Sequence, residues 1–376
     1  MLNFYVFVLT QKKLLIIVRL AFCITELNVG GAELIMCELA IRLFRRGHCV
    51  TVYSLQPRPV GTSCVPQLEA EGIPVKFLDM KNNFSLFSGF LKLRKLLREQ
   101  SPDILVSFLF HANFLSRIAA YFAGVQHIVS CIRVAERSAK WHLFWDRLTS
   151  GFVEKYICVS DSVAEFSRTV GGLPASKISV IHNGINIPPE TKKITDNKII
   201  FVGRLDYQKG VDWLIQTLPL WLAKLDDWEF TIVGDGVFRD KIKSQIDESL
   251  QKQVKILGWR ADAVKLISES KILLLPSRWE GMPKVILQAM SHAKPVVATN
   301  VEGVTELLGN LAEQQTCQFG DTEQFAQKIL NLANNPELAE KLGQENRERI
   351  ISKFSIENMI EQYEQLLSTI NSSASS

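Results

Sequence analysis

The sequence predicts an α/β fold of two domains, each a doubly wound parallel sheet. Short runs rich in Val and Ile alternate with amphipathic stretches along the chain, a pattern typical of parallel strands that are buried on both faces between covering helices. A length of 376 residues suits two domains of ordinary size. Residues 186–197 form a polar stretch with two prolines that interrupts the alternation near the middle of the chain.

The apolar runs predict seven strands before this stretch and five after it. In order, the predicted strands are residues 14–24, 49–54, 75–78, 104–109, 127–131, 156–159, 178–181, 199–202, 230–233, 254–257, 272–275 and 296–298. Residues 33–46 predict the first helix, because cations fill the last turn and Gly47 follows it. The later amphipathic stretches predict helices between the remaining strands.

Charge divides at the same point as the strand pattern. Residues 1–190 carry a net charge of +7, from 21 Lys and Arg against 14 Asp and Glu, and the remainder carries −3. We therefore predict that the first half meets an anionic partner and that the two domains enclose a cleft for a ligand. Nucleic acid is not indicated as that partner, since no recognised nucleic-acid-binding motif accompanies the positive charge.

The N-terminus and the cysteines indicate a cytoplasmic protein. Lys12, Lys13 and Arg19 interrupt the apolar start, so neither a membrane span of ~20 residues nor a signal peptide is predicted. Residues 1–13 are either an extension from an upstream start or a short membrane-contacting arm. The seven cysteines lack metal-site spacing and are interpreted as reduced core thiols. Cys317, the one considered as a nucleophile, has no histidine near it in the sequence and fits packing better.

Gly30 and Gly31 lie between the first predicted strand and the first predicted helix. Paired glycines allow a ligand to approach the backbone, and the helix N-terminus beyond them favours negative charge. The full GxGxxG pattern is absent, so a dehydrogenase is not indicated. A tight turn without a ligand explains the two glycines equally well.

A second motif, VGRLDYQKG, follows the strand at 199–202. Gly203 ends the strand, and Arg204 and Lys209 are two cations that can converge on one anion from the same loop. A diphosphate needs such an arrangement, because two neighbouring phosphates must be neutralised. The alternative is a pair of solvated surface cations.

The third motif, EGMPKVILQAM, begins just after the strand at 272–275. Pro283 is predicted as the first residue of a helix, whose free N–H groups then face the loop that carries Glu280 and Gly281. The Glu280 carboxylate can accept hydrogen bonds from sugar hydroxyls. Gln288, in the second helical turn, can reach the same place.

Together these motifs resemble the retaining glycosyltransferases of family four, which have the GT-B fold of two Rossmann-like domains facing across a cleft. The resemblance runs from about residue 14 to residue 367 and also includes CVSDSVAEF, VIHNGI, VGDG, SHAKPVVAT and residues 303–306. Within the family, the chain is most similar to enzymes that extend lipid-linked oligosaccharides, lipopolysaccharide or capsule precursors. We accordingly expect an N-terminal acceptor-side domain at 1–188, a nucleotide-sugar domain at 189–357 and a C-terminal helix at 358–372 that packs back on the first domain.

The resemblance implies a hexosyltransferase that uses a nucleotide-sugar such as a UDP-sugar, retains the anomeric configuration and needs neither cofactor nor metal. It assigns catalytic roles to Glu280, Lys209, Arg204 and His111. It assigns donor contacts to Gly30, Gly31, Gly203, Gly234, Trp259, Gly281, Met282, Pro283, Lys284, Val285 and Gln288. Arg133 and Glu136 are candidate contacts to the donor or the acceptor. The acceptor is expected to be a glycan or lipid-linked molecule, reached from the cytoplasmic face of the membrane.

One position departs from the family pattern of two glutamates eight residues apart, because Gln288 occupies the second. The family carboxylate holds the donor ribose, and an amide keeps one acceptor oxygen for that contact. Two alternatives stay open. One is a nucleotide-sugar-binding protein without turnover, for which Gln288 is the only hint. The other is another GT-B enzyme such as an epimerase or phosphorylase, although the short chain and the missing pyridoxal-type lysine signature argue against a phosphorylase. A basic segment with interleaved apolar residues, 81–98, is either a membrane-contacting helix or an ordinary sheet-covering helix.

Overall fold

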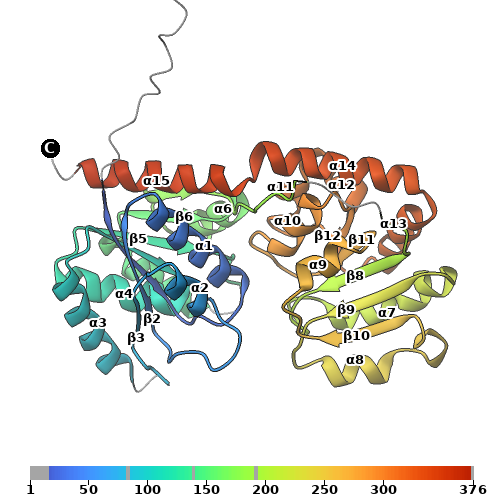
Figure 1. The fold of residues 1–376 in the computed structure, drawn as a ribbon, viewed down its shortest axis with the longest axis horizontal. Helices are drawn as coiled ribbons and strands as arrows, with labels where there is room; N and C mark the ends of the chain where they lie inside the picture. The colour runs from blue at the N-terminus through green and yellow to red at the C-terminus, as the bar shows by residue number, and fades with distance from the viewer. Residues whose placement is uncertain (1–16, 82–84, 138–139, 190–193, 374–376) are drawn as a thin grey trace, which may run out of the picture.

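The computed structural model describes residues 17–81, 85–137, 140–189 and 194–373. Two parallel sheets, each flanked by helices, lie next to each other along the long axis of the molecule (Figure 1). This arrangement confirms the predicted fold of two doubly wound α/β domains. The segment at 1–13, for which two origins were considered, lies outside the described residues.

The first sheet has seven parallel strands in the order β3-β2-β1-β4-β5-β6-β7. These strands are β1 (Arg19–Ile24), β2 (Cys49–Ser54), β3 (Val75–Phe77), β4 (Ile104–Phe108), β5 (His127–Ile132), β6 (Lys155–Cys158) and β7 (Ile178–Val180). The helices between them are α1 (Gly31–Arg45), α2 (Val65–Ala70), α3 (Leu86–Gln100), α4 (Phe110–Ala123), α5 (Lys140–Leu148) and α6 (Asp161–Thr169).

The second sheet has six parallel strands in the order β10-β9-β8-β11-β12-β13. These are β8 (Lys198–Val202), β9 (Glu229–Val233), β10 (Val254–Gly258), β11 (Ile272–Leu275), β12 (Val296–Thr299) and β13 (Thr316–Cys317). The helices are α7 (Val211–Trp221), α8 (Arg239–Gln245), α9 (Ala263–Ser268), α10 (Lys284–Ser291), α11 (Val304–Leu308), α12 (Ala312–Gln315), α13 (Thr322–Asn334), α14 (Pro336–Lys353) and α15 (Ile356–Ser373).

Successive strand residues point to opposite faces of each sheet, which gives each domain two apolar layers. In β1, Leu20 and Phe22 face the layer formed with α1, α2 and α15. Ala21 and Cys23 face the layer formed with α3 and α4. Continuous apolar runs were predicted for this reason, because neither face of such a strand meets water.

The elements differ from the sequence predictions mainly at their ends. The strand predicted at 14–24 begins at Arg19 within the described residues, and helix α1 begins at Gly31, two residues early. Pro283 is the N-cap of α10 rather than its first residue, with an extended backbone. Strand β13 was not predicted, because two residues are too few to form a recognisable apolar run.

The chain passes between the two domains at two places. The first passage follows β7, and the second joins α14 on the second domain to α15, which lies along the first domain (Figure 1). The passages are hydrogen-bonded to each other, since Ile185 N donates to Phe354 O at 2.9 Å and Ile356 N donates to Ile185 O at 3.0 Å. Helix α15 then buries Met359, Ile360, Tyr363, Leu367 and Ile370 in the core of the first domain.

Among the described residues, no helix combines the length and the apolar character that a membrane crossing requires. The seven cysteines are free thiols, and all but Cys49 are buried. Burial raises the pKa of Cys317 to about 12. Since a thiol at that pKa is protonated near neutral pH, the packing interpretation of Cys317 fits the structure better than the nucleophile.

Lys294 is an unusual core residue, because it is buried next to β12 and its ammonium has no hydrogen-bond partner among the described residues. Burial lowers its pKa from 10.5 to about 8. The unfolded chain therefore binds more protons between these two values, so stability rises with pH there, and the whole unfavourable contribution is present below pH 8. We expect Lys294→Met to raise the free energy of unfolding at neutral pH by about 1–2 kcal/mol.

Urea unfolding at pH 7 and pH 10 checks this expectation. The wild type should gain stability relative to Lys294→Met as the pH rises, because only the wild type carries the buried ammonium. An equal difference between the two proteins at both pH values would contradict it. The exposed Lys341 of α14 supplies the matched control Lys341→Met.

Candidate active site

The predicted catalytic residues and the glycine pair lie at the two points where the strand order reverses. In the first sheet the order reverses between β1 and β4, and the turns after these strands carry Gly30, Gly31 and His111. In the second sheet it reverses between β8 and β11, and the loops after these strands carry Gly203 to Lys209 and Glu280. Crevices at such switch points are where open α/β sheets bind ligands.

Lys209 and Glu280 form a buried ion pair between these two loops of the second domain. The Lys209 Nζ to Glu280 Oε1 distance is 2.5 Å, and the two side chains are 15% and 7% exposed. Ser277 Oγ donates to the same carboxylate oxygen at 2.6 Å. The structure therefore joins two of the four predicted catalytic residues in one partly dehydrated contact.

Arg204 lies on the same loop but remains mostly exposed. Its guanidinium contacts Asp206 Oδ2 at 3.2 Å and donates to Gln208 Oε1 at 2.8 Å. Gln208 in turn donates to the Trp279 carbonyl at 3.1 Å, which ties the Arg204 loop to the Glu280 loop. An exposed cation beside a buried pair is placed to meet an anionic ligand that enters from the cleft.

Arg278 is a residue of this site that the sequence reasoning missed. The Arg278 guanidinium pairs with both carboxylate oxygens of Asp212 at 2.7 and 2.8 Å. Its central carbon, Cζ, lies 3.7 Å from the Tyr207 ring centroid. The backbone N–H of Arg278 also donates to the backbone carbonyl of Gln208 at 2.8 Å. Arg278 thus fixes the two loops relative to each other, and the only signal was its place inside the third motif.

Several predicted donor glycines are explained by close backbone contacts. A side chain at Gly234, where φ is +143°, would collide with the Gly203 carbonyl of the neighbouring strand end. A side chain at Gly281 would collide with the Arg133 carbonyl, which belongs to the first domain. The two domains therefore touch directly at Gly281, and glycine is required there whether or not a ligand is bound.

The first domain reaches the same place through Arg133. Its guanidinium donates to Asn183 Oδ1, and Asn183 Nδ2 donates to the Met282 carbonyl at 3.2 Å.

At the glycine turn, the Glu33 carboxylate folds back over Gly30, whereas the space beside Gly31 is open. Burial, with a contribution from the Glu26 carboxylate, raises the pKa of Glu33.

Helix α4 begins directly after Leu109, whose φ of +70° is rare for a residue with a side chain, and His111 is the second residue of this helix. Its ring centroid is 5.8 Å from that of His142 on α5. Partial burial, followed by the effect of His142, lowers the pKa of His111. His142 Nδ1 lies 3.2 Å from Glu136 Oε2, so the predicted acceptor residue Glu136 belongs to the same neighbourhood as His111.

A cavity of about 250 Å³ separates α1 from α10 and is lined by Lys284 and Gln288. Glu38 of α1 and His292 after α10 also face it. Burial lowers the pKa of Lys284, and among the described residues its ammonium has no hydrogen-bond or ion-pair partner. Val285 is half-buried at the start of α10, and Trp259 is exposed after β10.

The family-like segments CVSDSVAEF, VIHNGI and 303–306 meet at a second contact between the domains. Glu306 of α11 accepts hydrogen bonds from the Asp161 N–H at 3.0 Å and from the His182 ring. Burial opposes ionisation of Glu306, but these hydrogen bonds outweigh it and lower its pKa. Asp161, His182 and Glu306 place possible metal-ligand atoms within 4.8 Å of one another. However, Glu306 lies at the N-terminus of α6, which favours an anion over a cation.

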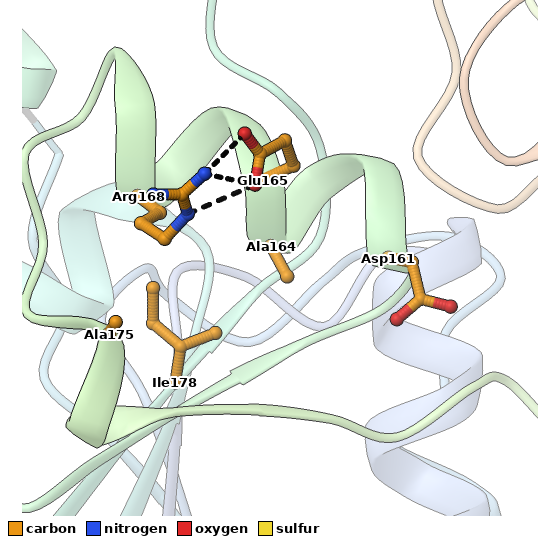
Figure 2. A pocket seen from close by; sticks show the side chains of 6 residues that line it. All are labelled: Asp161, Ala164, Glu165, Arg168, Ala175 and Ile178. Atoms are coloured by element: carbon orange, nitrogen blue, oxygen red, sulfur yellow. Dashed lines mark hydrogen bonds and ion pairs between the residues drawn. The ribbon is translucent and has the colours of Figure 1, made fainter.

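A further cavity, of about 360 Å³, is an open depression of the first domain between α6 and β7. Figure 2 shows that Arg168 and Glu165 on its rim pair with each other, while Asp161 lies at the far end. None of the predicted site residues lines it. The candidate active site is therefore assigned to the cleft at the strand switch points.

Comparisons with known proteins match both halves of the chain to sugar-transferring families. Residues 29–187 match the family described as Glycosyltransferase Family 4, and residues 196–335 match Glycosyl transferases group 1. The UDP-Gal:alpha-D-GlcNAc-diphosphoundecaprenol alpha-1,3-galactosyltransferase of Escherichia coli is 27% identical over 77% of this chain and 79% of its own. The capsular polysaccharide biosynthesis glycosyltransferase CapM of Staphylococcus aureus is 24% identical over 78% of this chain and 84% of its own.

Solved structures show the same fold at low sequence identity. Anabaena HepE in complex with UDP-glucose has a TM-score of 0.82 and 20% identity, and covers 93% of this chain and all of its own. The lipopolysaccharide outer core galactosyltransferase WaaB has a TM-score of 0.71 and 18% identity over 93% of this chain and 99% of its own.

Proposed function

Because the chain belongs to the glycosyltransferases of the GT-B type, we propose that it transfers a hexose, with retention, from a nucleotide-sugar to a lipid-linked or membrane-associated glycan. The E. coli relative named above acts, by its name, from UDP-galactose on a diphosphoundecaprenol-linked sugar. A UDP-sugar is accordingly the first donor to test.

The observation that carries this proposal is the buried Lys209–Glu280 pair with Arg204 beside it. In the proposed reaction the bond from the anomeric carbon to the diphosphate oxygen breaks, and the acceptor oxygen bonds to that carbon on the same face. The acceptor proton passes to a diphosphate oxygen. Lys209 and Arg204 stabilise the negative charge that builds on the leaving diphosphate, and the N–H groups at the start of α10 add to them.

Two measurements, made one after the other, test the proposal. Thermal-shift assays with UDP- and GDP-sugars identify the donor, since a ligand that binds only the folded protein raises its melting temperature. Incubation of that donor, radiolabelled in the sugar, with bacterial lipid extracts should then give a labelled lipid whose new linkage keeps the donor's anomeric configuration. Inversion of that configuration would contradict retention.

The second candidate is a nucleotide-sugar-binding protein without turnover, and Gln288 is the feature that favours it. A donor that raises the melting temperature while no extract or free glycan accepts the sugar would support this candidate. Release of free sugar from the donor alone would instead indicate a hydrolytic side reaction of an active site that lacks its acceptor.

We expect transfer to continue in the presence of EDTA. Two cations of the protein, Lys209 and Arg204, are placed to neutralise the diphosphate, which is the charge that a divalent ion would otherwise carry. Initial rates with EDTA and with added manganese should agree within about twofold. Loss of transfer in EDTA that manganese restores would contradict this expectation.

We expect Gln288→Glu to tighten UDP binding by about 5–30-fold, because a carboxylate that accepts ribose hydroxyls gains roughly 1–2 kcal/mol over an amide. Lys284, four residues earlier on α10 and facing the same cavity, lowers the cost of burying the new charge. Calorimetric titration of both proteins with UDP measures the change, and Gln344→Glu, at an exposed position of α14, is the charge-matched control. Weaker binding by the Gln288→Glu variant would show that Gln288 does not hold the ribose.

A further inference from the structure

Helix α5 carries a stripe of large apolar side chains that face outward. Trp141, Phe144, Trp145 and Leu148 recur at the spacing that places them on one helical face, and all four are exposed, Phe144 and Leu148 by 61% each. No residue of α5 is buried. A soluble surface rarely gathers this much apolar area on one short helix unless something covers it.

We propose that this stripe, the four α5 residues Trp141, Phe144, Trp145 and Leu148, docks the protein on an anionic lipid membrane beside the active site. The proposal rests on the proposed function only in its choice of a lipid-linked acceptor. It names the surface that meets the bilayer, and it differs from the membrane-contacting alternative for residues 81–98, in which α3 would be the contacting helix.

Charge selects a membrane over a second copy of the chain as the partner. Among the described residues from 81 to 148, which contain α3, α4 and α5, the exposed charged side chains are seven Lys and Arg and one Glu. Lys140 and Arg147 are exposed on α5 itself. Two such surfaces would repel each other, whereas anionic headgroups attract them while the aromatic side chains enter the interface.

The stripe is connected to the candidate active site by direct ring contacts. The Phe110 ring centroid lies 5.3 Å from that of Trp141 and 3.6 Å from that of His142, and Phe110 precedes His111 on α4. The Phe114 ring contacts Trp145 in the same way one turn later. A bilayer that holds α5 would therefore adjoin the wall of the cleft that carries His111, where the sugar end of a lipid-linked acceptor must arrive.

The tryptophans allow a direct test on the full chain. Seven tryptophans are present, and the two within residues 1–197 are both in the stripe. Vesicles of phosphatidylcholine and phosphatidylglycerol with bromine on the acyl chains should quench the fluorescence of the wild type. Quenching should weaken as salt is raised, because exposed charges are screened. Vesicles of phosphatidylcholine alone should bind the protein less.

Two double variants and a control locate the contact. Phe144→Ser with Leu148→Ser keeps both reporters and should weaken vesicle binding by about tenfold or more. Trp141→Phe with Trp145→Phe should keep sedimentation with vesicles but lose most of the quenching. Val237→Ser with Ile351→Ser removes two exposed apolar groups of the second domain and should behave as wild type. All substituted side chains are exposed, and melting temperatures confirm folding.

The proposal is overturned if quenching is absent or survives Phe144→Ser with Leu148→Ser. It is also overturned if that variant converts a dimer into a monomer without changing vesicle binding, since a second copy would then cover the stripe. Transfer to a free glycan without vesicle binding would leave the proposed function standing and remove the docking surface. Vesicle binding through the stripe without transfer to any acceptor would do the reverse.

Discussion

Replacing Lys209 by Ala should lower kcat by about 10²–10³-fold and change donor affinity far less. Negative charge grows on the diphosphate as the glycosidic bond breaks, so a preorganised cation is worth more in the transition state than in the bound donor. The geometry supports a large effect, because the Lys209 ammonium is held by Glu280 in a contact that is mostly shielded from water. Steady-state kinetics with the identified donor, together with calorimetric titration of UDP, separates the two effects.

The pair also has a structural role, which a second variant separates from catalysis. Lys209→Ala leaves Glu280 buried without its cation, so some loss of stability is expected. Lys209→Met with Glu280→Gln removes both charges and should recover most of the melting temperature but none of the rate. The exposed pair of Lys255 and Glu229 provides the control, since Lys255→Ala removes a contact of the same 2.5 Å length without a change in kcat. A kcat of Lys209→Ala within threefold of wild type would refute the assigned role.

Gly281→Ala should lower kcat by roughly a hundredfold although alanine adds a single methyl group. That methyl collides with the Arg133 carbonyl of the first domain, and a backbone atom cannot rotate away as a side chain would. The domains must therefore separate at this point, which moves Glu280 away from the first domain and from an acceptor held there. A displacement of about 1 Å between reacting groups costs on this order in rate.

Gly61→Ala is the matched control, because nothing lies within 4 Å of the position of its added methyl group. Small-angle scattering should show a larger radius of gyration for Gly281→Ala than for either Gly61→Ala or the wild type. Both variants should keep wild-type melting temperatures within a few degrees, since the strain is relieved by domain separation. Full activity of Gly281→Ala would mean that the domains do not need this contact during turnover.

The sequence predicts the sheets well because each strand is a local signal. The run Ile272–Leu275 is apolar at every position, and it is buried on both faces, as a central parallel strand requires. The loops after these strands were also predicted, since glycine, arginine and a proline before a helix are local features. What a loop touches is not local. Arg278 depends on Asp212, Tyr207 and Phe319, three residues from separate segments, so its role could not be read from the motif.

Two glycines also show that a sequence does not reveal which contact requires a residue. Gly234 and Gly281 were predicted to admit a donor, whereas the structure shows each of them opposite a carbonyl of another segment. Either cause requires glycine, and a sequence does not distinguish them. The α5 stripe was visible as a spacing of aromatic residues, but the same spacing is typical of a helix that faces a core.

The two passages between the domains determine how the cleft can open. A single passage would act as a tether and let the domains tumble in any direction. Here the two passages lie side by side and are bonded to each other at Ile185, and Gly184 packs against Ile356 so closely that no side chain would fit. Two bonded passages of this kind form a hinge with a single axis. We expect one rotation about this axis, in which the first domain and α15 move together as a rigid body. Every closure then brings the same residues of the two domains together, without a search over orientations.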